Sequence, residues 1–297
     1  MNKLPINPES YEENKGRFPS WLHRNLPKGS PFFATEDILK KYGLNTVCQE
    51  AKCPNRFECY AQGTATFLAL GKECTRNCGF CTIDFSRAPK KPQEDEPLRI
   101  ALSVKELKLK HVVVTMVARD DLSDGGAAHM AAIVRTIKTH CPAVKVEVLT
   151  SDFAGNYDAL DILLQEDLDV FNHNIETVCR LSPRVRHKAT YERTLALLHY
   201  VASQGSVPYV KSGLMVGLGE TVQEVEETLR DLQAAGCRMI TIGQYLQSHA
   251  RKLLVKQFVS PAQFEAYAEY GRSLGIPKMF CGPFVRSSYH AQDVFDN

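Results

Sequence analysis

The 297-residue chain lacks the features that would place it in a membrane or on nucleic acid. No apolar run approaches the ~18 residues that a membrane-spanning helix requires. The formal net charge at pH 7 is +2, whereas proteins whose main partner is nucleic acid usually carry a strongly basic domain. Internal repeats and low-complexity segments are absent as well. The stretch from Met1 to Gly16 is polar, so we expect neither export nor membrane anchoring.

Cysteine, by contrast, is plentiful. Three of the ten cysteines are Cys74, Cys78 and Cys81, spaced C-x3-C-x2-C, and we call them the downstream triad. Thiolates so close in sequence can face one point only if the chain wraps around a bound group, and soft thiolates select iron–sulfur or zinc centres. Three protein ligands would leave one iron of a four-iron cluster open to a small molecule, which is the signature of radical S-adenosylmethionine (SAM) enzymes. A zinc ion with a distant fourth ligand is the alternative, although zinc sites usually combine two short cysteine pairs.

A second group, Cys48, Cys53 and Cys59, has C-x4-C-x5-C spacing, and we call it the upstream triad. Two groups of three indicate two separate three-thiolate sites. A disulfide framework is the competing interpretation, but it fits poorly with a chain of this length that shows no secretory signal. We therefore expect a reducing, cytoplasmic compartment. The other cysteines are scattered, and most are expected to be buried small hydrophobic residues: Cys141, Cys179, Cys237 and Cys281.

Apolar β-rich runs alternate with helical patterns through the middle of the chain. The expected strands are Thr64–Leu70, His111–Val117, Val144–Thr150, Asp169–Asn174, Tyr209–Val216 and Met239–Tyr245. The expected helices are about Leu98–Leu109, Ala127–Thr139, Tyr157–Glu166, Tyr191–Ser203, Val222–Ala235 and Pro261–Leu274. Strands buried on both faces imply a parallel sheet. Six βα units are too few for a closed eight-stranded barrel, so we predict an α/β fold, a partial (β/α)6 TIM-like barrel, rather than a doubly wound sheet.

Polar and glycine-rich segments stand at or after the ends of several expected strands. These segments are Ala118–Gly126, Asn172–Thr177, Lys211–Glu220 and Gln244–Gln247. In barrel-like sheets the active site gathers at the C-terminal ends of the strands, and the downstream triad follows the first strand. A substrate pocket is therefore expected at these ends. His173, taken alone, is expected to be a satisfied core or turn residue.

Seven motifs stand out along nearly the whole chain. They are Cys48-x4-Cys53-Pro-Asn-x3-Cys59, Gly63-Thr-Ala-Thr-Phe67, Cys74-Thr-Arg-Asn-Cys78-Gly-Phe-Cys81, Arg119-Asp-Asp-Leu-x-Asp-Gly-Gly-Ala127, Asn172-His-Asn-Ile-Glu-Thr-Val178, Lys211-Ser-Gly-Leu-Met-Val-Gly-Leu-Gly-Glu-Thr221 and Arg286-Ser-Ser-Tyr289. Together they resemble the lipoyl synthase family. The two cysteine triads with the terminal Arg-Ser-Ser-Tyr carry most of the specificity, because the downstream triad alone identifies only the superfamily.

The resemblance implies two 4Fe–4S clusters and SAM as cofactors. The downstream triad would hold the catalytic cluster, which cleaves SAM to methionine and a 5′-deoxyadenosyl radical. The upstream triad would hold an auxiliary cluster whose fourth protein ligand is a serine, which we assign to Ser288 with Ser287 as the second choice. Members of this family insert sulfur at C6 and C8 of a protein-bound octanoyl-lysine, and the auxiliary cluster is consumed as the sulfur donor.

The resemblance also implies SAM contacts and partner proteins. By their positions at strand ends, Asn174, Glu176 and Arg186 are assigned to SAM, and Gly125 and Gly126 would let the backbone approach it closely. A surface charge at a helix start is the competing interpretation of Arg186. The implied substrates are octanoylated lipoyl carrier domains, those of 2-oxoacid dehydrogenase acyltransferase subunits or the glycine-cleavage H protein. Further implied partners are an electron donor such as flavodoxin or ferredoxin and a carrier that repairs the auxiliary cluster.

We expect three parts in the chain. Residues 1–62 form an N-terminal extension with the upstream triad, residues 63–275 form the barrel, and residues 276–297 form a segment that closes the auxiliary cluster site. Ser248–Leu254 departs from the family pattern, because two expected prolines are missing there, and Ser151 stands where a proline is more usual. Three other hypotheses remain: a different sulfur-inserting radical SAM enzyme, a non-catalytic iron–sulfur or zinc protein, and a family member impaired by the divergent loop.

Overall fold

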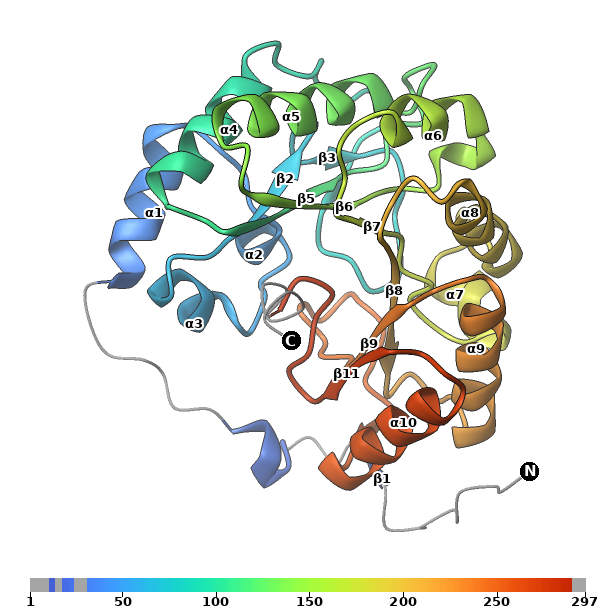
Figure 1. The fold of residues 1–297 in the computed structure, drawn as a ribbon. Helices are drawn as coiled ribbons and strands as arrows, with labels where there is room; N and C mark the ends of the chain where they lie inside the picture. Colours follow the sequence, from blue (N-terminus) through green and yellow to red (C-terminus); the bar gives the residue numbers. More distant parts are fainter. Residues whose placement is uncertain (1–10, 14–17, 24–30, 290–297) are drawn as a thin grey trace.

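The computed structural model describes residues 11–13, 18–23 and 31–289 of the chain. Its main feature is a curved, seven-stranded parallel sheet with the order β11-β9-β8-β7-β6-β5-β2 (Figure 1). The strands are β2 (Thr66–Ala69), β5 (His111–Met116), β6 (Lys145–Leu149), β7 (Val170–Asn172), β8 (Tyr209–Val216), β9 (Met239–Gln244) and β11 (Lys278–Gly282). Each strand pairs with the sheet strand that follows it in the chain. This order is that of a partial barrel, because a doubly wound sheet reverses its strand order at a switch point.

All six predicted strands are present in this sheet, and β11 is an addition to them. The run Lys278–Gly282 is short, follows Pro277 and contains a lysine and a glycine, so it lacks the apolar character of the other strands. It pairs in parallel with β9, with Lys278 opposite Met239. The expected closing segment therefore begins as the last strand of the barrel.

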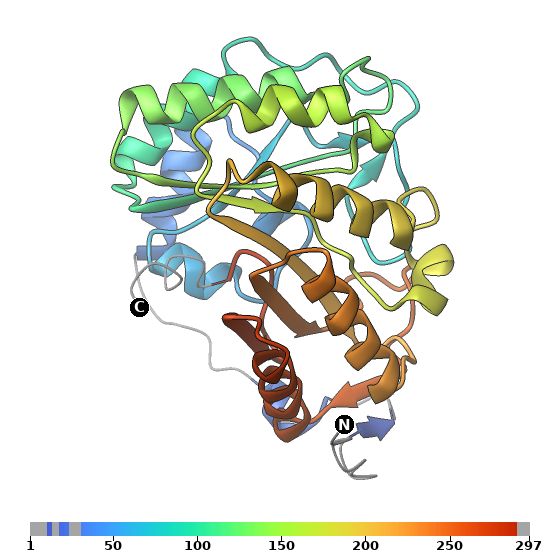
Figure 2. The same ribbon diagram turned by 45° about the vertical axis from the view of Figure 1, so that its right-hand side comes forward.

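Six helices cover the outer face of the sheet and confirm the predicted alternation (Figures 1 and 2). They are α4 (Glu96–Glu106), α5 (Ala127–His140), α6 (Tyr157–Leu164), α8 (Tyr191–Gln204), α9 (Val222–Ala234) and α10 (Pro261–Ser273). Thr221 and Glu224 form a capping box at the start of α9, and Ser260 caps α10 with Pro261 in its first turn. Strands β5 and β9 are buried along their whole length, as expected for strands covered on both faces.

Shorter elements surround the barrel. They are β1 (Tyr11–Glu13), η2 (Ser20–Leu22), α1 (Pro31–Lys41), α2 (Val47–Glu50), α3 (Arg56–Ala61), β3 (Glu73–Cys74), β4 (Asp84–Phe85), η3 (Phe153–Gly155), η4 (Cys179–Leu181), α7 (Ser182–Val185) and β10 (Gln257–Val259). Strand β1 pairs antiparallel with β10. Helices α1, α2 and α3 lie at the open side of the barrel, and the chain after β11 turns back toward α2 and α3 (Figures 1 and 2).

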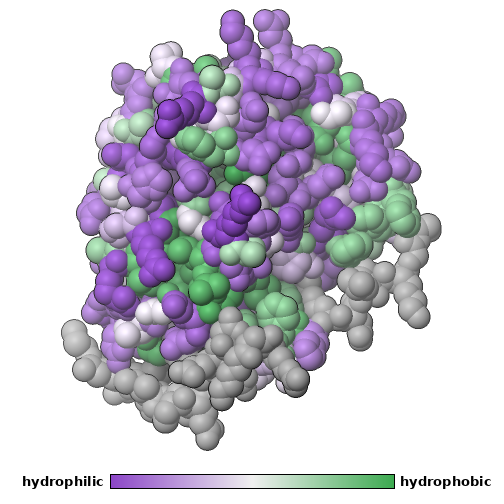
Figure 3. Space-filling model, turned by 180° about the vertical axis from the view of Figure 1, so that it is seen from behind, coloured by the Kyte–Doolittle hydropathy of each residue, from purple (hydrophilic) through white to green (hydrophobic). Residues whose placement is uncertain are grey.

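The surface seen from behind is mainly hydrophilic, with apolar groups in separate patches (Figure 3). Among the residues described, no helix combines the length and the apolar character needed to cross a bilayer. The expectations for Met1–Gly16 and for the end of the closing segment, residues 290–297, fall largely outside the described residues.

Candidate functional site

The upstream triad is carried by two short helices and the turn between them. Cys48 lies in α2 and Cys59 in α3, and Cys53 lies in the connecting turn. The Cys53 N–H donates to the Cys48 carbonyl oxygen at 3.1 Å, which closes this turn. Thr46 caps α2, and its hydroxyl also lies 2.7 Å from the hydroxyl of the buried Tyr60 on α3. These contacts hold the two helices together as one cysteine-bearing unit.

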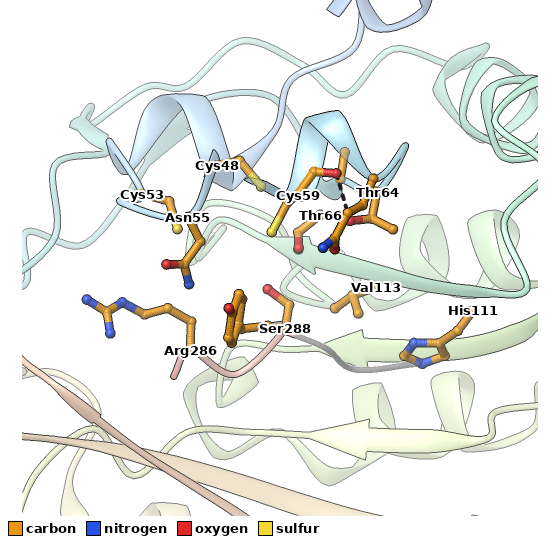
Figure 4. Close-up of a pocket in the computed structure, with 13 residues that line it drawn as sticks. Cys48, Cys53, Asn55, Cys59, Thr64, Thr66, His111, Val113, Arg286 and Ser288 are labelled. Carbon is orange, nitrogen blue, oxygen red and sulfur yellow. Dashed lines mark hydrogen bonds between the residues drawn. The ribbon is translucent and has the colours of Figure 1, made fainter. Parts of the chain in front are cut away.

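The three upstream thiols line one cavity together with the C-terminal segment (Figure 4). The space between the lining residues measures about 590 Å³, its opening to solvent included. The other lining residues are Asn55, Gln62, Thr64, Ala65, Thr66, His111, Val113, Arg286, Ser288 and Tyr289. In Figure 4, Ser288 and Arg286 lie across the cavity from the three cysteines. The fold thus brings Ser288 to the upstream triad from the far end of the chain.

Ser287 and Ser288 face different surroundings. Ser288 lines the cavity with the upstream triad. The Ser287 hydroxyl instead contacts the Asn174 side chain, with Oγ 2.7 Å from Nδ2 and 3.0 Å from Oδ1. The Ser287 carbonyl oxygen accepts a hydrogen bond of 2.5 Å from Lys211 Nζ. Of the two serines, Ser288 is therefore the one whose side chain faces the upstream thiols.

The downstream triad lies in a loop over the C-terminal ends of the strands. Cys74 is the last residue of β3, which pairs with β4, and Cys78 and Cys81 follow in the loop. The Thr75 N–H donates to the Ala118 carbonyl oxygen, just beyond the end of β5, at 3.0 Å. The loop is therefore tied to the end of the barrel where the sequence predicted the substrate pocket.

Arg76 fastens the downstream loop to two further strand ends. Its guanidinium pairs with Asp120 at 2.7 Å and with Asp152 at 2.6 Å, and its side chain is only 6 % exposed. Burial of Asp152 would raise the pKa of its carboxyl, but Arg76 and His173 outweigh burial and hold this pKa below its ordinary value. The Arg76 N–H also donates to Cys74 Sγ, at 3.4 Å. Buried charges thus fix the backbone beside the first downstream thiol.

The two triads lie near different ends of strand β5, but the loops that carry them touch each other. His111, the first residue of β5, lines the cavity of the upstream triad. Ala118, beyond the other end of β5, binds the downstream loop. The Thr82 hydroxyl, next to Cys81, donates to the Glu50 carbonyl oxygen, between Cys48 and Cys53, at 2.9 Å. Glu50 and Cys78 also line one cavity. The two cysteine-bearing loops therefore lie side by side.

The thiols of both triads form a donor set that fits iron–sulfur clusters. Burial, reinforced by the neighbouring thiols, raises the pKa of Cys48 and Cys81 to about 11 and that of Cys59 and Cys78 to about 12. A bound cationic centre would supply the charge that deprotonates them. Within residues 31–289 and the two short described segments before them, no three His, Cys, Asp or Glu side chains lie close enough to hold a single metal ion. Three cysteines on each side match a four-iron cluster with one further coordination position.

Asn174, Glu176 and Arg186 come together after β7. Arg186 donates to the Asn174 carbonyl oxygen, and Asn174 Nδ2 donates to Glu176 Oε1 at 3.1 Å. Burial raises the pKa of Glu176, and Arg186 and Asn174 partly offset this. Arg186 is only 4 % exposed, and it also donates to the Ala189 carbonyl and the Thr194 hydroxyl. The interpretation of Arg186 as a surface charge is therefore wrong, because its guanidinium is buried and bonded to protein groups.

His173 is a satisfied core residue, as predicted. Its Nδ1–H donates to the Thr150 carbonyl oxygen at 2.9 Å, and Nε2 lies 3.3 Å from the Thr194 hydroxyl. Burial, together with the nearby Arg186 charge, lowers the pKa of His173 to about 4. The imidazole is therefore neutral at pH 7, and it links the end of β7 to the end of β6.

Gly125 and Gly126 stand at the start of α5 with left-handed φ angles of 61° and 91°. A Cβ on Gly126 would lie 2.5 Å from Leu70 Cδ1, and a Cβ on Gly125 would lie 3.0 Å from Phe153 Cδ1. Close packing against these two side chains, together with the backbone conformation, explains why both positions are glycine. Their contact with SAM stays a prediction.

The barrel also contains a buried polar cluster that the sequence analysis did not predict. Lys211 Nζ lies 2.9 Å from Glu147 Oε1, and the two side chains are 2 % and 0 % exposed. Asn172 Nδ2 donates to the same carboxylate at 2.9 Å, and His111 Nε2 lies 3.7 Å from it. The available signal was a glutamate in the middle of the apolar run Val144–Thr150, because a fully buried carboxylate needs a partner.

The divergent loop Ser248–Leu254 packs against the loop of the downstream triad. The Leu253 N–H donates to the Gly79 carbonyl oxygen at 3.1 Å, and Lys252 Nζ lies 3.4 Å from Asn77 Oδ1. The loop thus contacts the downstream loop without the two prolines that the family pattern led us to expect.

Comparison with known proteins identifies the superfamily and its close relatives. Residues 68–232, more than half of the chain, match the Radical SAM superfamily. The chain is 58 % identical over 299 residues to the lipoyl synthase of Protochlamydia amoebophila (strain UWE25), which covers 99 % of this chain and 93 % of the relative. It is 50 % identical over 300 residues to the lipoyl synthase of Chlamydia felis (strain Fe/C-56), which covers 100 % of this chain and 96 % of the relative.

Solved structures share the fold at low sequence identity. Streptococcus suis SuiB bound to S-adenosylmethionine has a TM-score of 0.55 and 13 % identity, and the match covers 69 % of this chain and 46 % of that chain. Methylornithine synthase (PylB) has a TM-score of 0.55 and 14 % identity, and the match covers 71 % of this chain and 61 % of that chain. These likenesses confirm the architecture of the partial barrel.

Proposed function

The chain belongs to the lipoyl synthase family of the radical SAM superfamily, and we propose how its residues divide the work of sulfur insertion. It is a radical SAM enzyme that uses 4Fe–4S clusters and SAM to insert two sulfur atoms, at C6 and C8, into the octanoyl group of a lipoyl carrier protein. The observation that carries the division of roles is the cavity that Ser288 shares with the upstream triad.

In this proposal each triad would hold one cluster. The downstream triad would leave one iron free for the amino and carboxylate groups of SAM, and Ser288 would complete the upstream triad. When bound, the clusters supply the electron that cleaves SAM to a 5′-deoxyadenosyl radical and the sulfur atoms of the product. The Ser288 hydroxyl is a harder donor than the thiolates, so it would be the ligand that is released most easily. Undiminished turnover in a Ser288→Cys variant would contradict this role.

The residues after β7 and before α5 would surround SAM. We assign Asn174 and Glu176 to SAM contacts, with Arg186 holding the Asn174 carbonyl from within the protein. Gly125 and Gly126 shape the neighbouring turn at the start of α5. Because the two cysteine-bearing loops contact each other, a single acyl chain would be able to meet both sites.

We propose the same three parts that the sequence indicated. Residues 1–62 would carry the upstream triad, residues 63–275 the SAM-binding barrel, and residues 276–297 the serine that completes the auxiliary site. The specific carriers would be octanoylated 2-oxoacid dehydrogenase acyltransferase subunits or the glycine-cleavage H protein. Flavodoxin or ferredoxin would supply electrons, a separate carrier would rebuild the auxiliary cluster, and the compartment would be the cytoplasm.

The competing hypotheses have less support. Identity of 58 % to a lipoyl synthase over 99 % of the chain disfavours both a different sulfur-inserting enzyme and a non-catalytic iron–sulfur or zinc protein. An impaired family member would cleave SAM but leave the carrier without sulfur. The contacts between the Ser248–Leu254 loop and the downstream loop speak against such impairment.

Metal analysis tests the assignment of the triads directly. Wild type, reconstituted without oxygen, should bind about eight irons per chain, and the Cys48/Cys53/Cys59→Ala variant about four. That variant should still cleave SAM but should not add sulfur to an octanoylated carrier domain, as followed by mass spectrometry. The Cys141→Ala/Cys179→Ala variant, with two cysteines outside both triads, is the matched control. A wild-type content of about four irons, or bound zinc, would overturn the two-cluster assignment.

A further inference from the structure

A charged pair lies inside the barrel, where apolar side chains usually pack. Lys211 on β8 and Glu147 on β6 make N–O contacts of 2.9 and 3.2 Å, and the side chains are 2 % and 0 % exposed. Removing both charges from water is costly, and well-packed apolar residues are often as stabilising in such a place. The stability of the barrel therefore does not explain why this pair is present.

The Lys211 ammonium also reaches the C-terminal segment. An ammonium group has three donors; here it contacts the Glu147 carboxylate and the Ser287 carbonyl oxygen, the latter at 2.5 Å. Glu147 is itself held by Asn172 Nδ2 at 2.9 Å. The peptide after Ser287 is thus fixed from inside the barrel by a chain of charge-assisted hydrogen bonds, which are stronger than neutral ones.

Ser288 stands between this anchor and a second one. On its C-terminal side, the Tyr289 hydroxyl donates to Glu58 Oε1 at 2.9 Å, on the helix that carries Cys59. On its N-terminal side, Lys211 holds the Ser287 carbonyl. Since the carbonyl of Ser287 and the backbone N–H of Ser288 belong to one planar peptide unit, the position of Lys211 sets where the Ser288 side chain begins.

Building on the proposed role of Ser288, we propose that Lys211 and Glu147 are positioning residues that aim the Ser288 hydroxyl at the upstream triad. Lys211 acts through the Ser287 peptide and does not itself line the cavity of that triad. Glu147 compensates the lysine charge and fixes the ammonium in the direction of Ser287. The buried pair therefore serves the fourth ligand of the auxiliary cluster.

The test uses protein that can bind only the auxiliary cluster, and it measures the ligands of the iron sites instead of enzyme turnover. In a Cys74/Cys78/Cys81→Ala background, reconstitution with iron-57 should load about four irons per chain. Mössbauer spectroscopy should resolve an oxygen-ligated iron site apart from the thiolate-ligated sites in this parent. Adding Lys211→Met should remove the distinct site, while the three cysteines still hold iron.

Two further variants separate positioning from folding. Lys211→Met alone leaves Glu147 as a buried uncompensated charge, so the Glu147→Gln/Lys211→Met variant removes both charges. It should unfold within about 1 M urea of the parent and still lose the oxygen-ligated site. Lys138→Met is the matched control. It also removes a lysine from an ion pair, with Asp169 at 2.8 Å, but the lysine that contacts Ser287 is Lys211. The control variant should keep the parent spectrum.

The Ser288→Ala variant makes the two possible failures distinguishable. If Ser288→Ala leaves the spectrum of the parent unchanged, Ser288 is not a ligand, and both the proposed role of Ser288 and the positioning role are overturned. If Ser288→Ala removes the distinct iron site but the Glu147→Gln/Lys211→Met variant keeps it, the positioning role is overturned and the ligand role of Ser288 stands. Loss of the site in both variants, and its retention in Lys138→Met, is the expected result.

Discussion

The Asn55 side-chain amide donates a hydrogen bond of 2.7 Å to the Phe284 carbonyl oxygen, across 229 positions of the sequence. Asn55 lies two positions after Cys53, a cysteine of the upstream triad, and Phe284 lies four positions before Ser288. The contact therefore joins the two parts of the chain that together form the cavity in Figure 4. Neither part has its complete set of candidate ligands without the other.

Replacing Asn55 should weaken the contact between the upstream triad and the C-terminal segment. In Asn55→Ala, the Phe284 carbonyl loses a donor, and a hydrogen bond lost at a partly buried site costs about 1–2 kcal/mol. We expect the free energy of unfolding of the apoprotein, measured with urea, to fall by about this amount. The iron bound by the upstream triad should fall as well. Gln204→Ala, at the exposed C-terminal end of α8, is the control; an equal loss in both variants would contradict the prediction.

The Arg76–Asp152 pair should make the apoprotein sensitive to acid. Because the folded-state pKa of Asp152 lies below the ordinary 3.8, the stabilisation is fully present above that pH and is lost as the pH falls through the folded pKa. Above pH 4, Asp152→Asn should lower the free energy of unfolding by about 2 kcal/mol, because Arg76 keeps Asp120 as a partner. This difference from wild type should shrink below pH 4 in urea titrations.

The exposed Asp37→Asn variant is the control for charge removal on α1, and its curve should follow that of wild type at every pH. A constant difference between Asp152→Asn and wild type from pH 7 to pH 3 would mean that ionisation of Asp152 does not supply the stabilisation.

His173 should contribute a second pH dependence, at higher pH. Its folded-state pKa is about 4, against an ordinary value of 6.5, so the unfolded chain binds the proton first. The stability that the neutral imidazole provides is fully present above pH 6.5 and is lost as the pH falls toward 4. The change amounts to about 3 kcal/mol. In His173→Gln, urea unfolding should show a correspondingly flatter dependence between pH 6.5 and 4.

Two other histidines serve as references for this measurement. Burial also lowers the pKa of His111, and its contribution remains in both proteins and cancels in the difference. His199→Gln removes an exposed imidazole on α8 and should leave the wild-type slope. If His173→Gln keeps that slope too, the buried imidazole is not the group that titrates.

The sequence predicted those features whose signal is local. Six strands and six helices could be read from apolar periodicity and caps such as Thr221 and Ser260, and the two triads from cysteine spacing. The partners of buried polar groups could not be read in this way. Lys211 and Glu147 are 64 positions apart, and the sequence around either residue does not predict that the other is its partner. The choice between Ser287 and Ser288 likewise depends on which of them a distant lysine and asparagine hold.

The packing of the divergent loop yields a last prediction, at Gly79. A Cβ at this position would lie 3.0 Å from Leu253 Cδ1 and 3.2 Å from the Arg184 carbonyl oxygen. Such contacts are tighter than most Cβ atoms make, so a neighbour must shift by a few tenths of an ångström, and overpacking of this kind costs about 1–3 kcal/mol. We expect Gly79→Ala to destabilise the apoprotein by about 2 kcal/mol in urea and to lower the iron content of the downstream site.

The second variant decides which neighbour causes the strain. Leu253→Ala removes the side-chain atoms nearest to the new methyl group but leaves the backbone carbonyl of Arg184 in place. If Leu253 is the main obstacle, the Gly79→Ala/Leu253→Ala variant should recover at least half of the stability and iron lost in Gly79→Ala, because a side chain yields more easily than backbone. If stability and iron content do not recover, the backbone carbonyl of Arg184 is the main cause of the strain. Unchanged stability and iron in Gly79→Ala itself would show that the Ser248–Leu254 loop yields freely and does not restrain the downstream triad.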